Sequence, residues 1–240
     1  MEWADDFINN ALKNNIILSA SQIRTLVVLD IQQRLQSWDK ELAVINLTSP
    51  TKEELADVSF ANTSIFPALI REELDFDIEQ LRDTVVDRQS KFTDSQRAVL
   101  ETVMYAVENS KPLSLFIDAR GGTGKTYVLN AILAAARIIN GGSVGLAVGA
   151  TGIAANLLQL GRTFHSRFKV PLNINSESVY SINAQSTLAK LINMAKVIVW
   201  DEAPMSHRFQ MEALDRTLRD ITGLDEPFGG KVTALSGDFR

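Results

Sequence analysis

The sequence of 240 residues predicts an α/β fold, in which a parallel β-sheet carries helices on both faces. Three observations lead to this prediction. From Lys91 onward, short apolar runs alternate with longer runs of helical periodicity. One apolar run passes through a glycine-rich turn, Ala119–Thr126, into a helical run, and another ends abruptly in Asp201 and Glu202. Both turns follow a strand, which is where ligands bind in parallel α/β sheets.

The composition narrows the class of protein. A hydrophobic content of 45% and a charged content of 22% are ordinary for globular chains, and without a run of about 18 apolar residues we expect no membrane partner. The chain has no cysteine, which excludes disulfides and thiol catalysis and fits a reducing intracellular compartment. The net charge of −5 is uneven, because residues 1–90 carry −8 and residues 91–240 carry +3. A polyanionic partner would therefore bind to the second part.

The first 90 residues form a predicted helical N-terminal segment of unknown role. Apolar residues recur at helical spacing between Ile23 and Leu35 and again between Ile70 and Val85. A polar segment around Leu47–Asn62 separates the two runs. The segment contains no motif, and both a docking layer and the tail of a larger upstream protein fit its pattern.

Residues 91–240 form the predicted α/β domain. A helix over about 94–108 comes first, and one of its faces carries Ala98, Val99, Thr102, Val103, Ala106 and Val107. Strands are predicted where apolar and β-branched residues run together, at 113–118, 143–149, 196–200 and 231–236. Helical runs lie between and after them, at 125–139, 152–160, 187–195 and 207–221.

The glycine-rich turn predicts a phosphate-binding loop. Backbone N–H groups and the start of the next helix converge there, which suits the phosphate chain of a nucleotide. Lys125 can then reach the β- and γ-phosphates, and the Thr126 hydroxyl can hold Mg²⁺. The predicted nucleotide-binding residues are Gly121, Gly122, Thr123, Gly124, Lys125 and Thr126. The strict pattern has glycine where this chain has Ala119, and a chance Gly-Lys-Thr tripeptide in a loop is the alternative interpretation.

Acidic residues complete the predicted site. The apolar run Lys196–Trp200 ends in Asp201, and a carboxylate at the end of a buried strand can serve Mg²⁺ through its water shell. Glu202 is the candidate that orients or deprotonates an attacking water. The alternative is a strand that ends in surface acids. Two acids favour hydrolysis, so the predicted catalytic residues are Lys125, Asp201 and Glu202, with Thr126 and Asp201 at the metal.

A basic block follows the second predicted strand. Thr151 and Gly152 open a helix there and offer N–H groups to another phosphate. Beyond them, cationic residues alternate with aromatic ones, which combines phosphate neutralisation with base stacking. The cationic residues are Arg162, Arg167 and Lys169, and the aromatic ones are Phe164, His165 and Phe168. The alternative is a basic surface loop whose phenylalanines pack inward.

Taken in order, these blocks resemble the PIF-one-like (petite integration frequency) DNA helicases, particularly those of Helitron-type transposons. The resemblance covers about residues 65–240. Its lead-in is Ile70–Asp77, and the matching blocks are Phe116–Thr126, Thr151–Ala155, Gly161–Pro171, Trp200–Met205, Phe228–Val232 and Gly237–Arg240.

The resemblance implies a RecA-like P-loop NTPase, a superfamily 1 motor that uses ATP and Mg²⁺ to move 5′ to 3′ on single-stranded DNA. It also implies an intracellular, nuclear location and roles in DNA recombination, DNA repair and telomere maintenance. Residues 91–240 correspond to the first RecA-like half, truncated at its C-terminal end, and a second half is expected beyond residue 240. The blocks that resemble DNA-contacting motifs contain Thr151, Gly152, Thr163 and His165.

Gln96 resembles the glutamine that reads adenine in this family. The alternative is a capping box, because Thr93 lies three residues before it at the start of a predicted helix. The family pattern also has glycine and proline where this chain has Ala119 and Arg120. Alanine there would cost backbone strain if its φ were positive.

The sequence thus predicts a fragment of an ATP-dependent DNA helicase that hydrolyses ATP slowly and unwinds nothing alone. A degenerate module that binds nucleotide or DNA without turnover is the second hypothesis. A P-loop kinase for a small metabolite is the third.

Overall fold

The computed structural model describes residues 19–36, 42–45, 47–51, 54, 68–139, 143–171 and 173–239. The chain divides into two compact units, Met1–Asp75 and Phe76–Arg240. Among the described residues, no helix is both long enough and apolar enough to cross a membrane.

In the first unit the described elements are two α-helices, α2 (Ala20–Gln36) and α4 (Ala68–Leu74), and a 3₁₀ turn, η1 (Leu42–Ile45). Val28 and Leu42 form a small core. Helix α2 confirms the first predicted helical run, whereas the polar segment predicted at 47–62 lies largely outside the described residues.

The second unit is built on a five-stranded sheet of order β1-β5-β4-β2-β3, and all four neighbouring pairs are parallel. The strands are β1 (Leu113–Asp118), β2 (Val144–Gly149), β3 (Arg162–Thr163), β4 (Ala195–Asp201) and β5 (Val232–Gly237). Strands β2, β4 and β5 are buried over almost their whole length, as expected for central strands covered on both faces.

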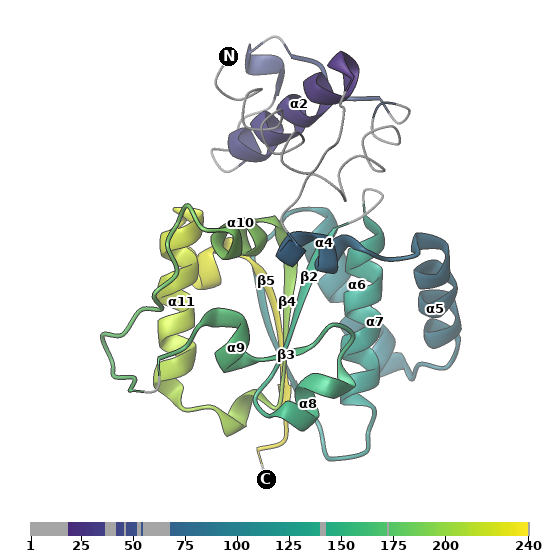
Figure 1. Ribbon diagram of the computed structural model, residues 1–240. Coiled ribbons are helices and arrows are strands. Elements are labelled where there is room, and N and C mark those ends of the chain that lie inside the picture. Colours follow the sequence, from purple (N-terminus) through teal and green to yellow (C-terminus); the bar gives the residue numbers. More distant parts are fainter. Residues whose placement is uncertain are drawn as a thin grey trace. The chain divides into compact units, whose positions relative to one another are not determined.

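Helices cover both faces of this sheet. Figure 1 shows α6 and α7 on one side and α10 and α11 on the other. The helices of this unit are α5 (Ile78–Ser90), α6 (Asp94–Glu108), α7 (Lys125–Ile138), α8 (Gly152–Leu157), α9 (Phe164–Phe168), α10 (Thr187–Met194) and α11 (Arg208–Thr222). Two 3₁₀ turns, η3 (Ala203–Met205) and η4 (Pro227–Gly230), complete it. The predicted α/β fold class is therefore confirmed.

Three features differ from the sequence-based expectation. The helical run predicted between Ile70 and Val85 is two helices, because the Asp77 carboxylate accepts from the Gln80 nitrogen at 3.0 Å and starts α5 anew. Leu81 and Val85 of α5 belong to the same core as α7, and α5 therefore lies in the second compact unit, which begins at Phe76. Strand β3 and helix α9 were not predicted, because elements of two and five residues are too short for a periodic pattern.

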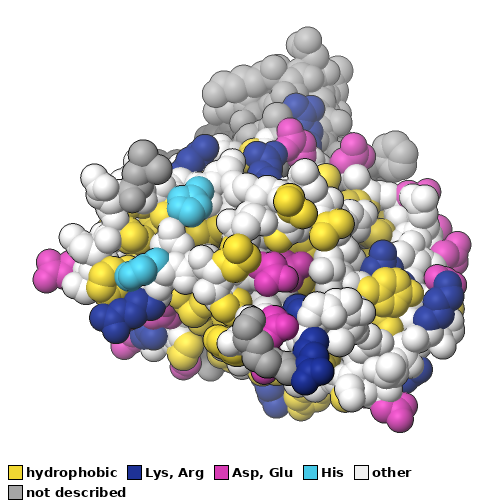
Figure 2. All heavy atoms as spheres, turned by 90° about the horizontal axis from the view of Figure 1, so that it is seen from below, with side chains coloured by type: hydrophobic (Ala, Val, Ile, Leu, Met, Phe, Trp, Pro, Cys, Tyr) yellow, Lys and Arg dark blue, Asp and Glu magenta, His cyan; other side chains and the backbone are white. Residues whose placement is uncertain are grey.

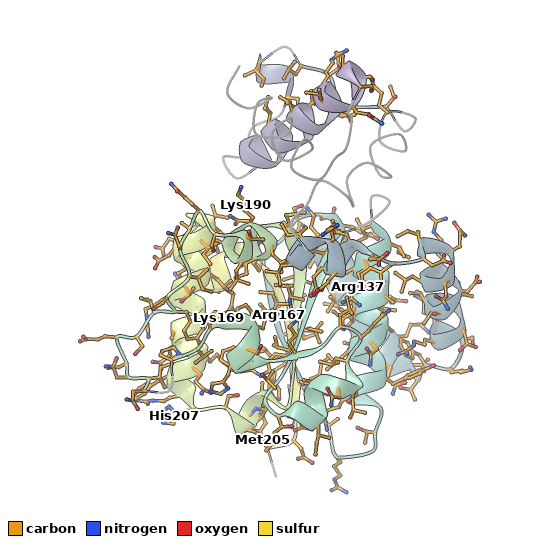
Figure 3. All side chains as sticks on the ribbon, viewed as in Figure 1. Arg137, Arg167, Lys169, Lys190, Met205 and His207 are labelled. Carbon is orange, nitrogen blue, oxygen red and sulfur yellow. The ribbon has the colours of Figure 1, made fainter. Side chains whose placement is uncertain are left out.

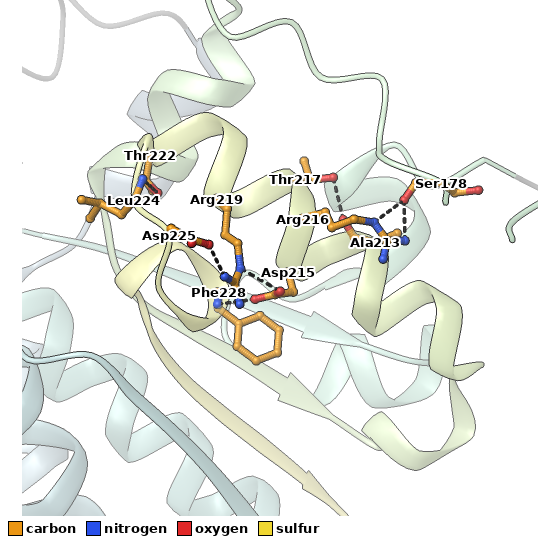
Figure 4. Close-up of polar contacts among 10 residues, drawn as sticks. All are labelled: Ser178, Ala213, Asp215, Arg216, Thr217, Arg219, Thr222, Leu224, Asp225 and Phe228. Atoms are coloured by element: carbon orange, nitrogen blue, oxygen red, sulfur yellow. Dashed lines mark hydrogen bonds and ion pairs between the residues drawn. The ribbon is translucent and has the colours of Figure 1, made fainter. Parts of the chain in front are cut away.

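Helix α11 anchors the segments on either side of it (Figure 4). Arg216 donates from Nε and Nη2 to the Ser178 carbonyl at 3.1 and 2.7 Å. Asp215 accepts from Arg219 Nε at 2.9 Å and also from the Phe228 backbone nitrogen. The loop that leads into β5 is thereby held to the helix before it, which fixes where β5 begins.

Gly149, the last residue of β2, allows α8 to pack closely on the strand. A Cβ at this position would lie 2.4 Å from the Ala155 nitrogen and 2.8 Å from the Ala154 carbonyl carbon. Both neighbours are backbone atoms of α8, so they cannot rotate away. Helix α8 can therefore pack this closely against the end of β2 only because residue 149 is a glycine.

We expect Gly149→Ala to lower the free energy of unfolding by about 1–3 kcal/mol, because the added methyl group pushes α8 off the sheet. Gly145→Ala in the same strand is the matched control, since a Cβ there has its nearest neighbour at 3.4 Å. Urea unfolding followed by circular dichroism compares the two variants. Equal midpoints would contradict the proposed packing constraint.

Candidate functional site

The candidate site lies at the carboxyl ends of β1, β4 and β5, which adjoin in the sheet. The glycine-rich turn follows β1, Asp201 ends β4, and Gly237 ends β5. Figure 2 views this side of the molecule, from the end of the sheet nearest the C-terminus in Figure 1. Because the three strands are parallel, their termini bring side chains together that are more than 100 residues apart in sequence.

The glycine-rich turn needs glycine at two positions. Gly122 and Gly124 have φ angles of 76° and 89°, which side-chain-bearing residues rarely adopt. Ala119 is not among the described residues with positive φ, and its nitrogen donates to the Gly237 carbonyl at 3.3 Å. The alanine that replaces the usual glycine therefore extends the sheet without backbone strain.

Lys125 is folded into the turn and is only 8% exposed. Its Nζ donates to the carbonyl oxygens of Ala119 and Arg120. The Thr123 hydroxyl also donates to the Arg120 carbonyl, at 2.8 Å. The ammonium group thus lies inside the loop that the sequence predicts to surround a phosphate, held by carbonyls that a stronger anionic acceptor can replace.

Asp201 is the centre of the hydrogen-bond network, and it is 2% exposed. Its Oδ2 accepts from Thr126 Oγ1 at 2.9 Å. Its Oδ1 accepts from the Ser236 hydroxyl and from the Glu202 backbone nitrogen, the latter at 3.0 Å. Sequence reasoning missed Ser236, and the only signal for it was its place at the end of a strand of the same sheet.

Thr126 and Asp201 fit a magnesium ion by donor chemistry. A hydroxyl and a carboxylate oxygen, already 2.9 Å apart, are hard oxygen ligands. Among the described residues no group of three or more acidic or histidine side chains could form a cage for a metal. Mg²⁺ takes few protein ligands and completes its shell with water and phosphate.

Glu202 sits in a strained turn directly after Asp201. Its φ and ψ are 55° and 38°, the left-handed conformation, which costs free energy in a residue with a side chain. The turn is held in place from β5, because a Cβ at Gly237 would lie 2.3 Å from Cδ of Pro204. The close contact of Pro204 with Gly237 therefore helps to hold the backbone turn that carries Glu202.

Gln96 makes contacts that fit both of its interpretations. It forms the predicted capping box of α6, since Thr93 N donates to its Oε1 at 3.1 Å and Gln96 N donates to Thr93 Oγ1 at 3.4 Å. Its Nε2 also donates to the Thr123 carbonyl at 3.1 Å. The capping box is confirmed, and the side chain lies against the glycine-rich turn. Adenine recognition stays a prediction.

The basic block divides into a buried and an exposed set. Arg167 is 2% exposed, and its Nη2 donates to the Leu160 carbonyl at 3.2 Å. The expectation that it faces DNA is therefore corrected: this side chain is part of the fold (Figure 3). His165 and Lys169 are exposed, and Arg162 is half-buried.

The aromatic residues of the block also pack inward. Phe164 and Phe168 are fully buried, and the Phe164 ring stacks on Trp200 with centroids 3.9 Å apart and planes 13° apart. Base stacking on these two rings is excluded, and the alternative in which they pack inward is confirmed. The stacking ties α9 to β4, next to Asp201.

Thr151 and Thr163 have the same local function, because each caps a short helix. Thr151 Oγ1 accepts from the Ala154 nitrogen at 3.2 Å, and Thr163 Oγ1 accepts from the Ser166 nitrogen at 3.3 Å. Gly152 is exposed at the start of α8. Two exposed apolar side chains, Ile153 and Leu157, also lie on α8. Two others lie elsewhere: Met205 ends η3, and the Phe239 ring packs against Phe116 of β1.

A parallel sheet with a glycine-rich Gly-Lys-Thr turn after one strand and a buried aspartate at the end of another is typical of the P-loop class of nucleotide-binding proteins. A family model described as PIF1-like helicase matches residues 91–240, and the chain belongs to that family. The prediction of a PIF1-like helicase is confirmed, and the Helitron-type branch stays a prediction.

The chain is similar to curated helicases over a part of their length. The ATP-dependent DNA helicase PIF4 of Trypanosoma brucei brucei is 37% identical over 131 residues, which are 52% of this chain and 16% of that protein. The ATP-dependent DNA helicase RRM3 of Saccharomyces cerevisiae is 27% identical over 169 residues, 66% of this chain and 23% of that protein. The chain thus spans about a sixth to a quarter of these relatives.

Among solved structures, the chain is similar to the Pif1 helicase from Bacteroides in complex with ADP-AlF3 and ssDNA. The sequences are 26% identical, the match covers 61% of this chain and 32% of that one, and the TM-score is 0.49. The Pif1 helicase from Candida albicans gives 24% identity, coverage of 62% and 32%, and a TM-score of 0.48.

We expect Arg167→Ala to lower the free energy of unfolding by roughly 2–4 kcal/mol, because it removes a buried side chain and a donor to the Leu160 carbonyl. Lys169→Gln is the matched control and should change it by less than about 0.5 kcal/mol, since Lys169 is exposed. Chemical unfolding of both variants measures the difference. If the two variants are equally stable, Arg167 is not a structural residue.

Proposed function

We propose that this chain is the ATP-binding, RecA-like part of an ATP-dependent DNA helicase that moves 5′ to 3′ on single-stranded DNA. The observation that carries the proposal is the hydrogen bond between Thr126 and the buried carboxylate of Asp201. Thr126 directly follows the glycine-rich turn, in which Ala119 causes no backbone strain. Membership in the PIF1-like helicase family supports the same activity. The curated relatives are named ATP-dependent DNA helicases.

In this proposal the turn Gly121–Gly124 surrounds the phosphates with backbone N–H groups, and Lys125 leaves its carbonyl partners for the β- and γ-phosphate oxygens. Thr126 and Asp201 would hold Mg²⁺, which neutralises phosphate charge when it is bound. Glu202 orients the attacking water and accepts its proton. Gln96, already in contact with the turn through Thr123, contacts the adenine base.

Single-stranded DNA is assigned to exposed and half-buried residues that follow β2 and that lie in and after β3. Thr151 and Gly152 lie at the start of α8, where backbone N–H groups can bind a phosphate, and Thr163 and His165 lie at the start of α9. Arg162 and Lys169 contribute positive charge for the phosphates. Arg167 has no part in this contact, because it is buried.

A second RecA-like half is proposed to close the far side of the nucleotide, because the curated relatives are much longer than the region they share with this chain. An arginine from an opposing surface is worth about 10³–10⁵ in rate in other phosphoryl-transfer enzymes. We therefore propose weak ATP hydrolysis and no duplex unwinding by these 240 residues alone. A nuclear role in DNA repair, recombination and telomere maintenance is proposed from the family.

The function is tested by ATP hydrolysis with and without single-stranded DNA. We expect slow turnover that DNA stimulates and that Lys125→Ala lowers by roughly a hundredfold or more, because the phosphate charge loses its counter-ion. Lys190→Ala, an exposed lysine on α10, is the control. Turnover that is equal in the two variants, or that is indifferent to DNA, would contradict the proposal, and so would robust unwinding by this chain.

The role of Asp201 is tested through Ser236. We expect Ser236→Ala to raise the Mg²⁺ concentration for half-maximal ATP hydrolysis about two- to tenfold, because one hydrogen bond that orients the carboxylate is lost. Ser114→Ala, a hydroxyl near the other end of the sheet that pairs with Thr233, is the control. A Mg²⁺ requirement unchanged by Ser236→Ala would show that this bond does not orient the metal site.

A further inference from the structure

The chain has two histidines, and one glutamine side chain contacts both. Gln210 lies in the first turn of α11, and its Nε2 is 3.0 Å from Nε2 of His165 in α9. Its Oε1 accepts from the backbone nitrogen of His207, the N-cap residue, at 3.2 Å. Figure 2 shows both histidine side chains on the face at the carboxyl ends of the strands, and Figure 3 labels His207 at the lower end of the domain, as it does Met205.

The positions of the amide and ring hydrogens of Gln210 and His165 follow from which atoms can donate and which can accept. The His207 backbone nitrogen is a donor, so the Gln210 carboxamide must present its oxygen to it and its NH₂ group to His165. An NH₂ group only donates, so His165 Nε2 must accept, which leaves the ring proton on Nδ1. The bond from His207 N to Gln210 is part of the capping box of α11, and it therefore dictates the tautomer of a histidine on a different helix.

His207 carries the opposite tautomer by the same reasoning. Its Nδ1 accepts from the Phe209 backbone nitrogen at 3.2 Å, so its ring proton lies on Nε2. The two histidines thus provide an internal contrast, since each ring is fixed by a separate backbone or side-chain donor.

The tautomer leaves His165 with a second ring nitrogen, Nδ1, that can donate a hydrogen bond. The ring is exposed, is held at 85° to the buried Phe164 ring, and its Nδ1 has no hydrogen-bond partner among the residues that the structure describes. Thr163 and Lys169 flank it in the segment assigned above to DNA. Phosphate oxygens only accept hydrogen bonds at neutral pH, so an Nδ1–H group suits them and an Nδ1 lone pair does not.

We propose that Gln210 is a positioning residue that holds neutral His165 in the Nδ1–H form, so that this ring donates a hydrogen bond to a phosphate of single-stranded DNA. The DNA contact rests on the proposed function, whereas the tautomer does not. Gln210 also caps α11, and α11 follows the Asp201–Met205 segment of the nucleotide site. The orientation of the His165 ring is therefore coupled to the start of α11.

The tautomers can be measured directly by long-range ¹H–¹⁵N NMR of the imidazole rings at about pH 8, where histidine is usually neutral. We expect one ring protonated on Nδ1 and the other on Nε2. His207→Asn assigns them, because it leaves only His165 and asparagine is a good N-cap residue. A His165 ring protonated on Nε2 would overturn the proposal.

Gln210→Glu tests the function of the tautomer. Glutamate keeps an acceptor for the His207 nitrogen, so the capping box survives, but its second oxygen faces His165 Nε2 and demands a proton there. We expect the His165 proton to move to Nε2 and the affinity for single-stranded oligonucleotide to fall roughly tenfold.

Gln185→Glu is the matched control, because it adds the same charge at an exposed glutamine elsewhere. If Gln210→Glu leaves the His165 proton on Nδ1, or binds DNA as well as Gln185→Glu, the proposal is overturned. If the tautomers are as expected but the unmodified chain binds no single-stranded DNA, the proposed function fails and the tautomer assignment stands.

Discussion

The buried carboxylate of Asp201 is the constraint on which the arrangement of this site depends. A charge removed from water is tolerated only where hydrogen bonds replace its hydration. Here the donors come from the first turn of α7, the end of β5 and the turn after β4. Satisfying one carboxylate therefore fixes three chain segments relative to each other, and these segments carry the phosphate-binding and catalytic candidates.

Close backbone packing makes this arrangement possible. The end of β5 lies against Pro204 over Gly237, and β1 continues past Asp118 because Ala119 pairs with the Gly237 carbonyl. Glu202, whose backbone is strained, lies two residues before Pro204. Strain of this kind persists only where neighbouring contacts determine the geometry, and it is common at functional sites. The rigid packing of Pro204 on Gly237 thus accounts for a conformation that the local sequence disfavours.

Much of the fold could be predicted because its signals are local. Strands β1 and β5 and helices α6 and α7 follow from apolar runs and helical periodicity, and the glycine turn follows from its motif. Ser236 could not be found in this way, because a serine at the end of a strand acquires its role only from the carboxylate beside it. The capping box of Gln96 was predictable from spacing, whereas its contact with Thr123 depends on how α6 packs beside the glycine-rich turn.

The basic block shows why residue type alone does not identify a binding surface. In α9, a helix of five residues, Phe164, Arg167 and Phe168 point into the core at helical spacing, and His165 and Ser166 point outward. Of the alternating cationic and aromatic residues, only a few therefore remain exposed, and Lys169 and the half-buried Arg162 supply the positive charge of this surface. On such a surface, one N–H donor such as that of His165 contributes a larger share of the phosphate contacts than it would among many arginines. Its control by Gln210, on α11, is a feature that only the packed structure reveals.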